Sequence, residues 1–400
     1  QRCGRPVLVT AVSARDRRKD RGINLEAVRW FDDPVALAGD PEIDVVIELI
    51  GGAEGVAKEV TETALASGKH VITANKAMIA HHGTELARRA EEAGAVLSYE
   101  AAVCGGIPVI KSLREGLAAN AISAVYGIMN GTSNFILSQM RDTGREFSEV
   151  LQEAQKLGYA EADPSFDVDG YDAAHKLAIL AALAFNAEVD YANLHVEGIR
   201  EVTSVDIAFA EELGYRIKLL GIAKRENGKI SQRVHPVMVK RNVPIANVEG
   251  VNNAVVAEGD FVGSILSEGA GAGAGPTASA VVADLIDIAR GIRLPTFAVP
   301  ASALEAATPA PMAEHEGGYY LRLMCLDRPG VIAGVAAALR DHDISVETLV
   351  QRGRGPGGEA VPVVITTHET RESAMRGALA QIEALEAVLE PPRVIRIEAF

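Results

Sequence analysis

Four short runs of β-branched and apolar residues recur through the first hundred residues, separated by segments with helical spacing. The runs are VLVTAVSA (7–14), DVVIELI (44–50), HVITANK (70–76) and AVLSYEAAV (95–103), and the helical segments are 24–40, 55–68 and 83–94. Apolar strands joined by helices predict a parallel sheet that is covered on both faces. A doubly wound sheet of this kind binds ligands at the carboxyl ends of its strands. We therefore expect an α/β fold with a ligand site at those strand ends.

The glycine turn that opens a dinucleotide-binding fold is not found before these runs. In such folds the first strand leads into G-x-G-x-x-G, and nothing of that form precedes residue 7. The run 7–14 is therefore expected to be the second strand of an incomplete Rossmann-like sheet, with a gap in the core where the first strand would lie. We expect the natural chain to carry roughly 30 further residues upstream, including a Val/Ile-rich strand and the glycine turn.

The remaining residues divide into a larger and a smaller unit. The larger unit mixes helices with β-rich runs, including a hairpin expected to turn at Asn227-Gly228. The smaller unit follows the order strand, helix, strand, strand, helix, strand, which is that of a ferredoxin-like domain. The predicted organisation is a nucleotide-binding domain (1–107), an α+β substrate domain (108–299), a Pro/Ala-rich linker (300–316) and the ferredoxin-like domain (317–400). The Gly/Ala-rich segment 268–290 is expected to pack back on the nucleotide-binding domain.

Composition and charge exclude several classes of function. The formal net charge of -15 argues against nucleic acid as a partner, because phosphate binding needs a basic surface. No apolar run reaches the roughly 18 residues of a membrane span, and no secretory signal opens the chain, so no membrane partner is expected. The cysteines, Cys3, Cys104 and Cys325, are scattered without a disulfide framework, which favours a reducing cytoplasm.

An acidic stretch, GYAEADPSFDVDGYDAAHKLAIL (158–180), carries the strongest chemical signal in the sequence. Asp172 and Lys176 are four residues apart, so they share one face of a helix. The helix continues as an almost wholly apolar run, which indicates that the pair is buried. On spacing alone, a catalytic or substrate role and a surface ion pair of little energetic value both stay open. Metal binding by the carboxylates of the preceding loop (Asp163, Asp167 and Asp169) is a weaker alternative.

Three further positions bear on a site. Lys76 ends the third apolar run and is expected to face the ligand crevice, with a surface position as the alternative. In GIMNGTSNFIL (127–137), small polar groups could contact a ligand, or Asn130 or Thr132 could cap a helix. Cys104 lies in an apolar run without a neighbouring basic residue, so an inert packed thiol is favoured over a nucleophile.

Five segments together resemble homoserine dehydrogenase, in this order and spacing and over almost the entire chain. They are TANKAM, YEAAVCGGIP, NGTSNFIL, LGYAEADPSFDVDGYDAAHKL and GAGAGAGPTASAVVAD. The later segments LDRPGVIAGVAAAL and ISVETLVQ resemble the ACT domain, a regulatory module that senses amino acids. The resemblance implies a Rossmann-like domain, an α+β substrate and dimerisation domain and a C-terminal ACT domain. It also implies NAD(P)H-dependent interconversion of L-aspartate 4-semialdehyde and L-homoserine, on the route to threonine and methionine.

The resemblance assigns chemistry to particular residues of this chain. Lys176 would be the acid/base that protonates the nascent alkoxide, and Lys76 would lie beside both the nicotinamide and the substrate. Glu161 and Asp172 would hold the amino end of the substrate, because carboxylates suit an ammonium group. Such an enzyme manages two ligands and one proton, since the cofactor carries the hydride.

The resemblance also implies sites for a nicotinamide cofactor and a monovalent cation such as sodium. The residues expected to contact the cofactor are Lys76, Gly158, Gly269, Ile50 and Arg15. The cation would be held by side chain or carbonyl oxygens of Glu100, Val103, Gly105 and Ile107. Arg15 follows the second strand, where a basic residue can meet a 2′-phosphate, while Asp16 could instead take the ribose hydroxyls. We expect NADP in preference to NAD.

Regulation and assembly follow from the ACT-like segment. Threonine is the expected effector, bound near the DRPG turn, and a homo-oligomer (dimer or tetramer) is expected because ACT modules pair side by side. Removal of the residues after about Ala313 is expected to leave activity intact. Two rival functions are a semialdehyde dehydrogenase that uses Cys104 as its nucleophile and a non-catalytic amino-acid sensor.

Overall fold

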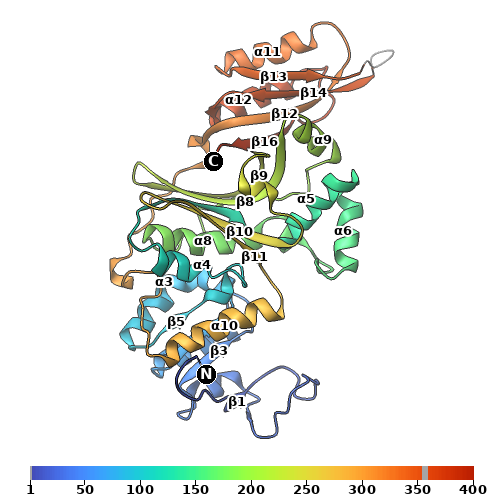
Figure 1. Ribbon diagram of the computed structural model, residues 1–400. Helices are drawn as coiled ribbons and strands as arrows, with labels where there is room; N and C mark the ends of the chain where they lie inside the picture. Colours follow the sequence, from blue (N-terminus) through green and yellow to red (C-terminus); the bar gives the residue numbers. More distant parts are fainter. Residues whose placement is uncertain (1, 354–358) are drawn as a thin grey trace.

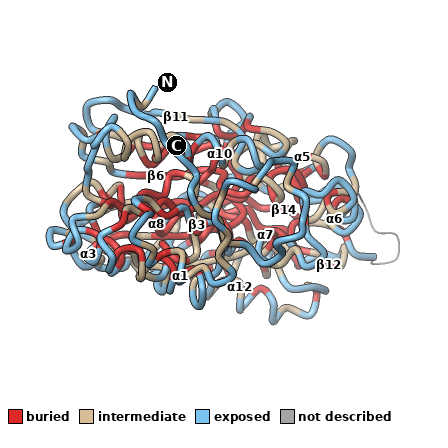
Figure 2. Tube along the Cα trace, turned by 90° about the horizontal axis from the view of Figure 1, so that it is seen from below, coloured by how far each residue is buried: buried red, intermediate tan, exposed pale blue. Residues whose placement is uncertain are grey.

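The computed structural model describes residues 2–353 and 359–400 and arranges them around three β-sheets. Figure 1 shows an elongated molecule in which the N-terminal region and the C-terminal strands lie at opposite ends. Buried residues run through its centre, around β6 (Ile122–Ile128) and α8 (Tyr171–Phe185) (Figure 2). No helix in the described part of the chain is both long and apolar enough to cross a lipid bilayer.

The N-terminal region contains two small parallel sheets. One consists of β3 (Val45–Glu48), β4 (His70–Thr73) and β5 (Leu97–Ser98), with α2 (Val56–Ala66) and α3 (Lys76–Glu92) in the connections between its strands. The other pairs β1 (Ala11–Val12) with β2 (Arg29–Trp30). The predicted parallel α/β arrangement is therefore confirmed, although β1, β3, β4 and β5 are each shorter than the apolar run that predicts them.

The helix predicted for residues 24–40 is wrong over its first part. Arg29 and Trp30 form strand β2, and only α1 (Pro34–Gly39) is helical. The side chain of Asp33 caps this helix by accepting a hydrogen bond from the N–H of Val35, at 2.9 Å. Pro34 then occupies the first turn, where its missing N–H removes no helical hydrogen bond. Short apolar runs do not distinguish a strand from a helix by spacing alone, which accounts for the error.

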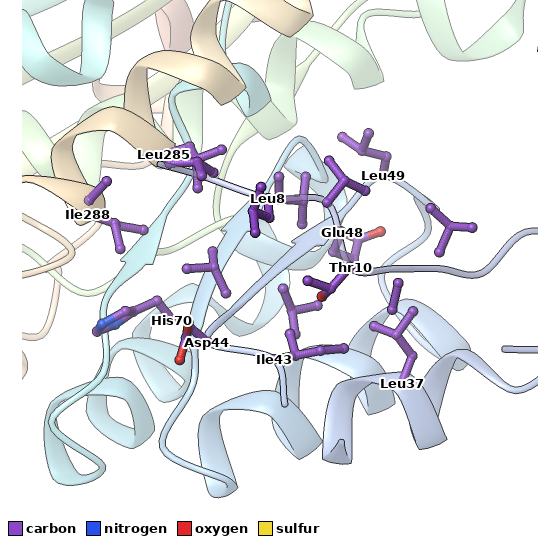
Figure 3. Close-up of a pocket in the computed structure, with 18 of the residues that line it drawn as sticks. Leu8, Thr10, Leu37, Ile43, Asp44, Glu48, Leu49, His70, Leu285 and Ile288 are labelled. Carbon is purple, nitrogen blue, oxygen red and sulfur yellow. The ribbon is translucent and has the colours of Figure 1, made fainter. Parts of the chain in front are cut away.

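β1 and β3 do not pair with each other, and a cavity of about 1110 Å³ lies between them. Leu8 and Thr10 line it from the N-terminal segment, and Leu285 and Ile288 of α10 (Ala274–Ala289) close it from another side (Figure 3). The apolar side chain of Leu8 is 76% exposed, because no strand among residues 2–353 and 359–400 covers it. The parallel sheet is thus interrupted where the sequence predicts a gap in its core.

The middle region is built on antiparallel strands covered by helices. The strands are β6, β8 (Tyr215–Glu226), β9 (Lys229–Lys240), β10 (Asn252–Gly259) and β11 (Gly263–Ala270), and the helices include α5 (Gly131–Thr143), α6 (Phe147–Lys156), α7 (Ser165–Val168) and α9 (Ser204–Glu212). The predicted hairpin is confirmed, since Asn227 and Gly228 have φ of 51° and 77° between β8 and β9. Two successive residues with positive φ are what a type I′ turn requires.

α8 positions the candidate site. Its apolar residues pack against β6, β8 and β9 on one side and against α3 on the other. The helix ends at Asn186, which takes the left-handed conformation (φ 51°) and donates its N–H to the carbonyl of Ala182. Because almost every residue of α8 is buried, its polar residues Asp172 and Lys176 lie in the protein interior.

The C-terminal strands and helices have the predicted ferredoxin-like order. The elements are β12 (Glu316–Leu326), α11 (Val331–Asp341), β13 (Val346–Gln351), β14 (Ala360–Thr367), α12 (Glu372–Glu383) and β16 (Arg393–Glu398). The sheet runs β16-β12-β14-β13 and does not stop at β16. β16 also pairs in parallel with β9, with Ile397 opposite Met238, so within the described residues one sheet of eleven strands extends through both regions.

Buried ion pairs join the C-terminal domain to the middle region. Arg322 of β12 donates to Asp206 of α9 at 2.6 Å, and the hydroxyl of Tyr320 donates to the same carboxylate. Arg233 of β9 pairs with Glu398 of β16 at 2.6 Å. The continuous sheet and these contacts make the C-terminal domain an integral part of the structure, which the predicted linker does not anticipate.

Candidate active site

Three segments that are distant in sequence meet around one carboxylate. Lys76 starts α3 directly after strand β4, and the side chain of Asn75 caps that helix by accepting from the N–H of Met78 at 3.0 Å. Asp172 and Lys176 lie in the first turns of α8, and Asn130 lies between β6 and α5. The strand-end position of Lys76 and the helical spacing of Asp172 and Lys176 thus bring the three charged groups together.

Asp172 is the centre of this cluster and is 3% exposed. Its Oδ2 atom lies 2.7 Å from the Nζ atom of Lys176, and its Oδ1 atom lies 2.7 Å from the Nζ atom of Lys76. The amide Nδ2 of Asn130 donates to Oδ2 at 2.8 Å, while Asn130 Oδ1 accepts from the N–H of Ser133 and caps α5. Asn130 is therefore both the helix cap considered from the sequence and a partner of Asp172.

The charges of the cluster fix its protonation. Burial by itself would raise the pKa of Asp172, but the ammonium groups of Lys176 and Lys76 outweigh it and hold that pKa below its ordinary value. Burial by itself would lower the pKa of Lys176, but the carboxylate of Asp172 reverses the effect and raises it. Lys176 is consequently a protonated donor at neutral pH.

The ammonium group of Lys176 has one N–H donor that could bind a ligand. Its ammonium donates to Asp172 and, at 2.7 Å, to the carbonyl oxygen of Met129. An ammonium group has three N–H donors, so one is left beyond these two partners within the described residues. Lys76 is more open, with its side chain 35% exposed and its Nζ 5.6 Å from the ring centre of Phe166.

The other acidic residues of the stretch separate from one another. Asp167 accepts from Asn130 Nδ2 at 2.8 Å, Asp169 pairs with Arg200, and Asp163 accepts from the N–H of Ser165. These carboxylates do not converge, and the described residues contain no group of three His, Cys, Asp or Glu side chains that could hold a metal ion. The structure therefore gives no support to a metal site at this loop.

Glu161 and Gly158 lie in the turn between α6 and α7. The turn is tied to α5, because the hydroxyl of Thr132 donates to the carbonyl of Tyr159 at 2.6 Å. Glu161 is exposed, and its carboxylate has no hydrogen bond or ion pair within the described residues, so the structure does not bring it into contact with Asp172. Gly158 is exposed and has φ of 76°, which favours glycine.

The ends of β3 and β4 form a shared polar edge. Glu48, which is buried at the end of β3, accepts hydrogen bonds from the N–H groups of Ile50 and Gly51 and from the hydroxyl of Thr73. This brings the predicted cofactor residue Ile50 to the carboxyl edge of the sheet. The sequence motifs do not single out Glu48, although an acidic residue within an apolar run is a recognisable signal.

Arg15 is exposed and lies just beyond β1, where it lines the cavity together with Ile50. Two other arginines of the same segment, Arg17 and Arg21, stack on the ring of Trp30 at 5.6 and 5.5 Å. The segment that follows β1 therefore presents positive charge at the carboxyl end of the strand.

The predicted cation loop packs against the C-terminal end of β11. The N–H of Gly106 donates to the carbonyl of Ala270 at 2.9 Å, and a Cβ at Gly269 would lie 3.3 Å from Ile107. Both carboxylate oxygens of Glu100 accept backbone N–H groups, of Ile110 and Lys111, and burial raises the pKa of Glu100 to about 7. With the side chain so engaged, carbonyl oxygens are the ligands that this loop has to offer an ion.

Val103, Cys104 and Gly105 are buried in the middle of this loop. Cys104 is 1% exposed and its Sγ atom accepts a hydrogen bond from Asn253 Nδ2 at 3.4 Å. Burial raises the pKa of the Cys104 thiol, so the thiolate that an acyl-enzyme mechanism needs is disfavoured. The structure thus favours the packed thiol over the nucleophile.

Comparison with known proteins agrees with the geometry. Residues 108–286 match the family model for homoserine dehydrogenase, residues 1–100 match that for the homoserine dehydrogenase NAD binding domain, and residues 319–386 match that for the ACT domain. The chain therefore has a Rossmann-type NAD-binding domain and a C-terminal ACT domain, as predicted, and it uses a nicotinamide cofactor.

Known relatives are similar in sequence to the chain over its whole length. Homoserine dehydrogenases from Neisseria gonorrhoeae and Pseudomonas aeruginosa are 47% and 48% identical to the chain, covering 100% of it and 93% and 92% of their own lengths. The crystal structure of a homoserine dehydrogenase from Thiobacillus denitrificans superposes with a TM-score of 0.92 at 47% identity, covering 99% of this chain and 91% of the other. The chain belongs to the homoserine dehydrogenase family and is an oxidoreductase.

Proposed function

We propose that the chain reduces L-aspartate 4-semialdehyde to L-homoserine with Lys176 as the proton donor. The observation that carries this proposal is the buried carboxylate of Asp172, shared by two lysines at the carboxyl edge of a nucleotide-binding sheet. A bound nicotinamide cofactor supplies the hydride. The protein has to orient the aldehyde and deliver one proton to the oxygen that gains negative charge.

Lys176 is suited to the proton transfer. It is held by Asp172 and the Met129 carbonyl, and its remaining N–H can point to the substrate oxygen. Its pKa is raised by Asp172, which keeps the proton on the lysine until an alkoxide, a far stronger base, forms beside it. In the reverse direction, the same nitrogen would accept the proton of the homoserine hydroxyl.

Substrate binding is assigned to Glu161 and Asp172. The carboxylate of Glu161 is exposed and has no ion pair within the described residues, so it can meet the substrate ammonium. Asp172 already faces two ammonium groups, so it would meet a third only where Lys76, whose side chain is 35% exposed, gives way. The main contribution of Asp172 in this proposal is to hold Lys176 charged and in place.

Cofactor and cation sites are assigned to the edges of the same region. Lys76, Ile50, Gly158, Gly269 and Arg15 would contact the nicotinamide cofactor, and the arginines after β1 favour the 2′-phosphate of NADP. A relative described as a hyperthermophilic archaeal homoserine dehydrogenase in complex with NADPH is 31% identical over 68% of this chain, with a TM-score of 0.58. Carbonyl oxygens of Glu100, Val103, Gly105 and Ile107 would hold a monovalent cation such as sodium.

Domain boundaries, regulation and assembly complete the proposal. The nucleotide-binding domain would extend over 1–107, the catalytic and dimerisation domain over 108–299 and the ACT domain over 317–400. Threonine would bind the ACT domain, and the enzyme would be a dimer or tetramer, because ACT domains sense amino acids and pair side by side. Within the described residues β13 is the outer strand of the sheet, and its Leu349 is 44% exposed. A second copy of the chain could cover this side chain.

The test is steady-state NADPH oxidation with L-aspartate 4-semialdehyde by the wild type and by Lys176→Ala. We expect kcat to fall by about 10²–10⁴-fold in the variant, which is the usual contribution of a general acid or base, with an unchanged KM for NADPH. A variant whose kcat stays within about twofold of the wild type would remove Lys176 from the mechanism.

A further inference from the structure

Asn253 of β10 has a buried carboxamide that the roles proposed above do not use. The residue is 1% exposed. Its Nδ2 atom donates to the carbonyl oxygen of Met129 at 3.1 Å and to the Sγ atom of Cys104 at 3.4 Å. The Met129 carbonyl can only accept, so the amide nitrogen has to face it, and the opposite oxygen, Oδ1, has no partner within the described residues. A buried amide oxygen without a partner costs about 1–3 kcal/mol. The two hydrogen bonds donated by the amide nitrogen therefore hold the side chain in this orientation.

The Met129 carbonyl that Asn253 bonds is the one that holds Lys176. It accepts from Lys176 Nζ at 2.7 Å as well as from Asn253 Nδ2. A carbonyl oxygen has two lone pairs, and these two donors use both. The carbonyl lies in the short connection between β6 and α5, and Asn253 anchors it to the neighbouring strand β10, which pairs with β6 through Ala254 and Ile128.

The carboxamide is also fixed from its other side. A Cβ at Gly271 would overlap the carboxamide carbon of Asn253, so the glycine backbone leaves the room that this side chain fills. Gly271 also lies next to Gly105 of the predicted cation loop. A Cβ at Gly105 would lie 3.1 Å from the Gly271 carbonyl oxygen. Asn253 therefore joins the connection that holds Lys176 to the predicted cation loop and to Gly271, which directly follows β11 and lies two residues after the predicted cofactor residue Gly269.

We infer that Asn253 is a positioning residue for Lys176, acting through the Met129 carbonyl that directs the lysine ammonium toward the substrate. The inference rests on the proposed role of Lys176. Without the amide donor, the 129–130 peptide loses the contact that holds its carbonyl direction, and Lys176 loses a fixed partner. A displacement of about 1 Å at a reacting group can cost roughly 10²-fold in rate, so the effect belongs to kcat.

The test uses Asn253→Asp and Asn253→Ala in the full chain, together with Asn252→Ala as a matched control. Asp has the shape of Asn but no N–H to donate, so Asn253→Asp keeps the packing against Gly271. The adjacent Asn252 donates to Glu268 at 2.9 Å and has no hydrogen bond to Met129. We expect kcat to fall about 10- to 100-fold in both Asn253 variants. The KM for NADPH and the activity of Asn252→Ala should stay near the wild-type values.

A double-mutant cycle separates positioning from a general structural role. If Asn253 acts through Lys176, then Asn253→Asp should change kcat by less than about twofold once Lys176 is already alanine. A loss that multiplies with that of Lys176→Ala, or wild-type kcat in a folded Asn253→Asp, would overturn the inference and leave the role of Lys176 intact. Wild-type kcat in Lys176→Ala alone would instead overturn the proposed function, and this inference with it.

Discussion

Replacing Asp172 with asparagine tests the electrostatic core of the site. The substitution keeps the side-chain shape but removes the negative charge that lies 2.7 Å from both Lys176 and Lys76. It also turns one oxygen into an amide nitrogen, and one of the present donors, Lys176, Lys76 or Asn130, then faces another donor. Two buried or half-buried ammonium groups are left without their counterion.

The magnitude follows from burial and distance. Removing one partner of a buried ion pair costs about 3–5 kcal/mol, and one pKa unit corresponds to about 1.4 kcal/mol. Asp172 opposes the effect of burial on the pKa of Lys176, so without Asp172 burial disfavours the ammonium form. If most of the lost energy falls on the ionisation of Lys176, its pKa drops by about 2–3 units.

The assay is the pH dependence of kcat for reduction of the semialdehyde. The reduction needs protonated Lys176, so the alkaline limb of the profile should move to lower pH by about 2 units in Asp172→Asn, with a lower plateau. Asp169→Asn is the matched control, because its partner Arg200 is exposed and such pairs contribute at most about 1 kcal/mol. An alkaline limb that stays within about half a pH unit of the wild type would show that Asp172 does not hold Lys176 in its charged form.

Three further predictions follow from the domain contacts and the cofactor edge. Burial by itself would raise the pKa of Glu398, but Arg233 and its neighbours outweigh it and lower that pKa from 4.5 to about 2. This lowered pKa contributes stability that is present above pH 4.5 and lost as the pH falls toward 2, so Tm should drop over that range, and less steeply in Glu398→Gln. Deletion of residues 314–400 should lower Tm and the yield of folded protein, because Asp206 and Arg233 lose their buried partners at about 3–5 kcal/mol each; an unchanged Tm would contradict this. Arg15→Ala should raise the KM for NADPH about tenfold, as expected for a lost charged hydrogen bond, and leave that for NADH unchanged; equal effects on both would count against a 2′-phosphate contact.

Sequence patterns that extend over a few residues predict the positions of Lys76, Asp172 and Lys176. Lys76 is placed by its position at the end of a parallel strand, and Asp172 with Lys176 by helical spacing ahead of an apolar run. The hairpin at Asn227-Gly228 follows from turn chemistry in the same way. Each of these signals lies within a few residues of the feature that it predicts, and each is confirmed as a placement by the structure.

Long-range contacts account for what the sequence does not predict. Asn253 bonds to the carbonyl of a residue 124 positions earlier, and Arg322 to a carboxylate 116 positions earlier. The pairing of β9 with β16 also joins segments that are distant in the sequence, and nothing in either strand specifies the other as its neighbour. Removal of the residues after Ala313 therefore looks harmless from the sequence but not from the structure.

The most direct test of the account is to identify the product formed from L-aspartate 4-semialdehyde and NADPH by the purified enzyme. Mass spectrometry should find L-homoserine in amounts equal to the NADPH oxidised, with formation abolished or strongly reduced in Lys176→Ala and retained in Cys104→Ala. Absence of homoserine, or turnover that is lost in Cys104→Ala while Lys176→Ala stays active, would contradict the account.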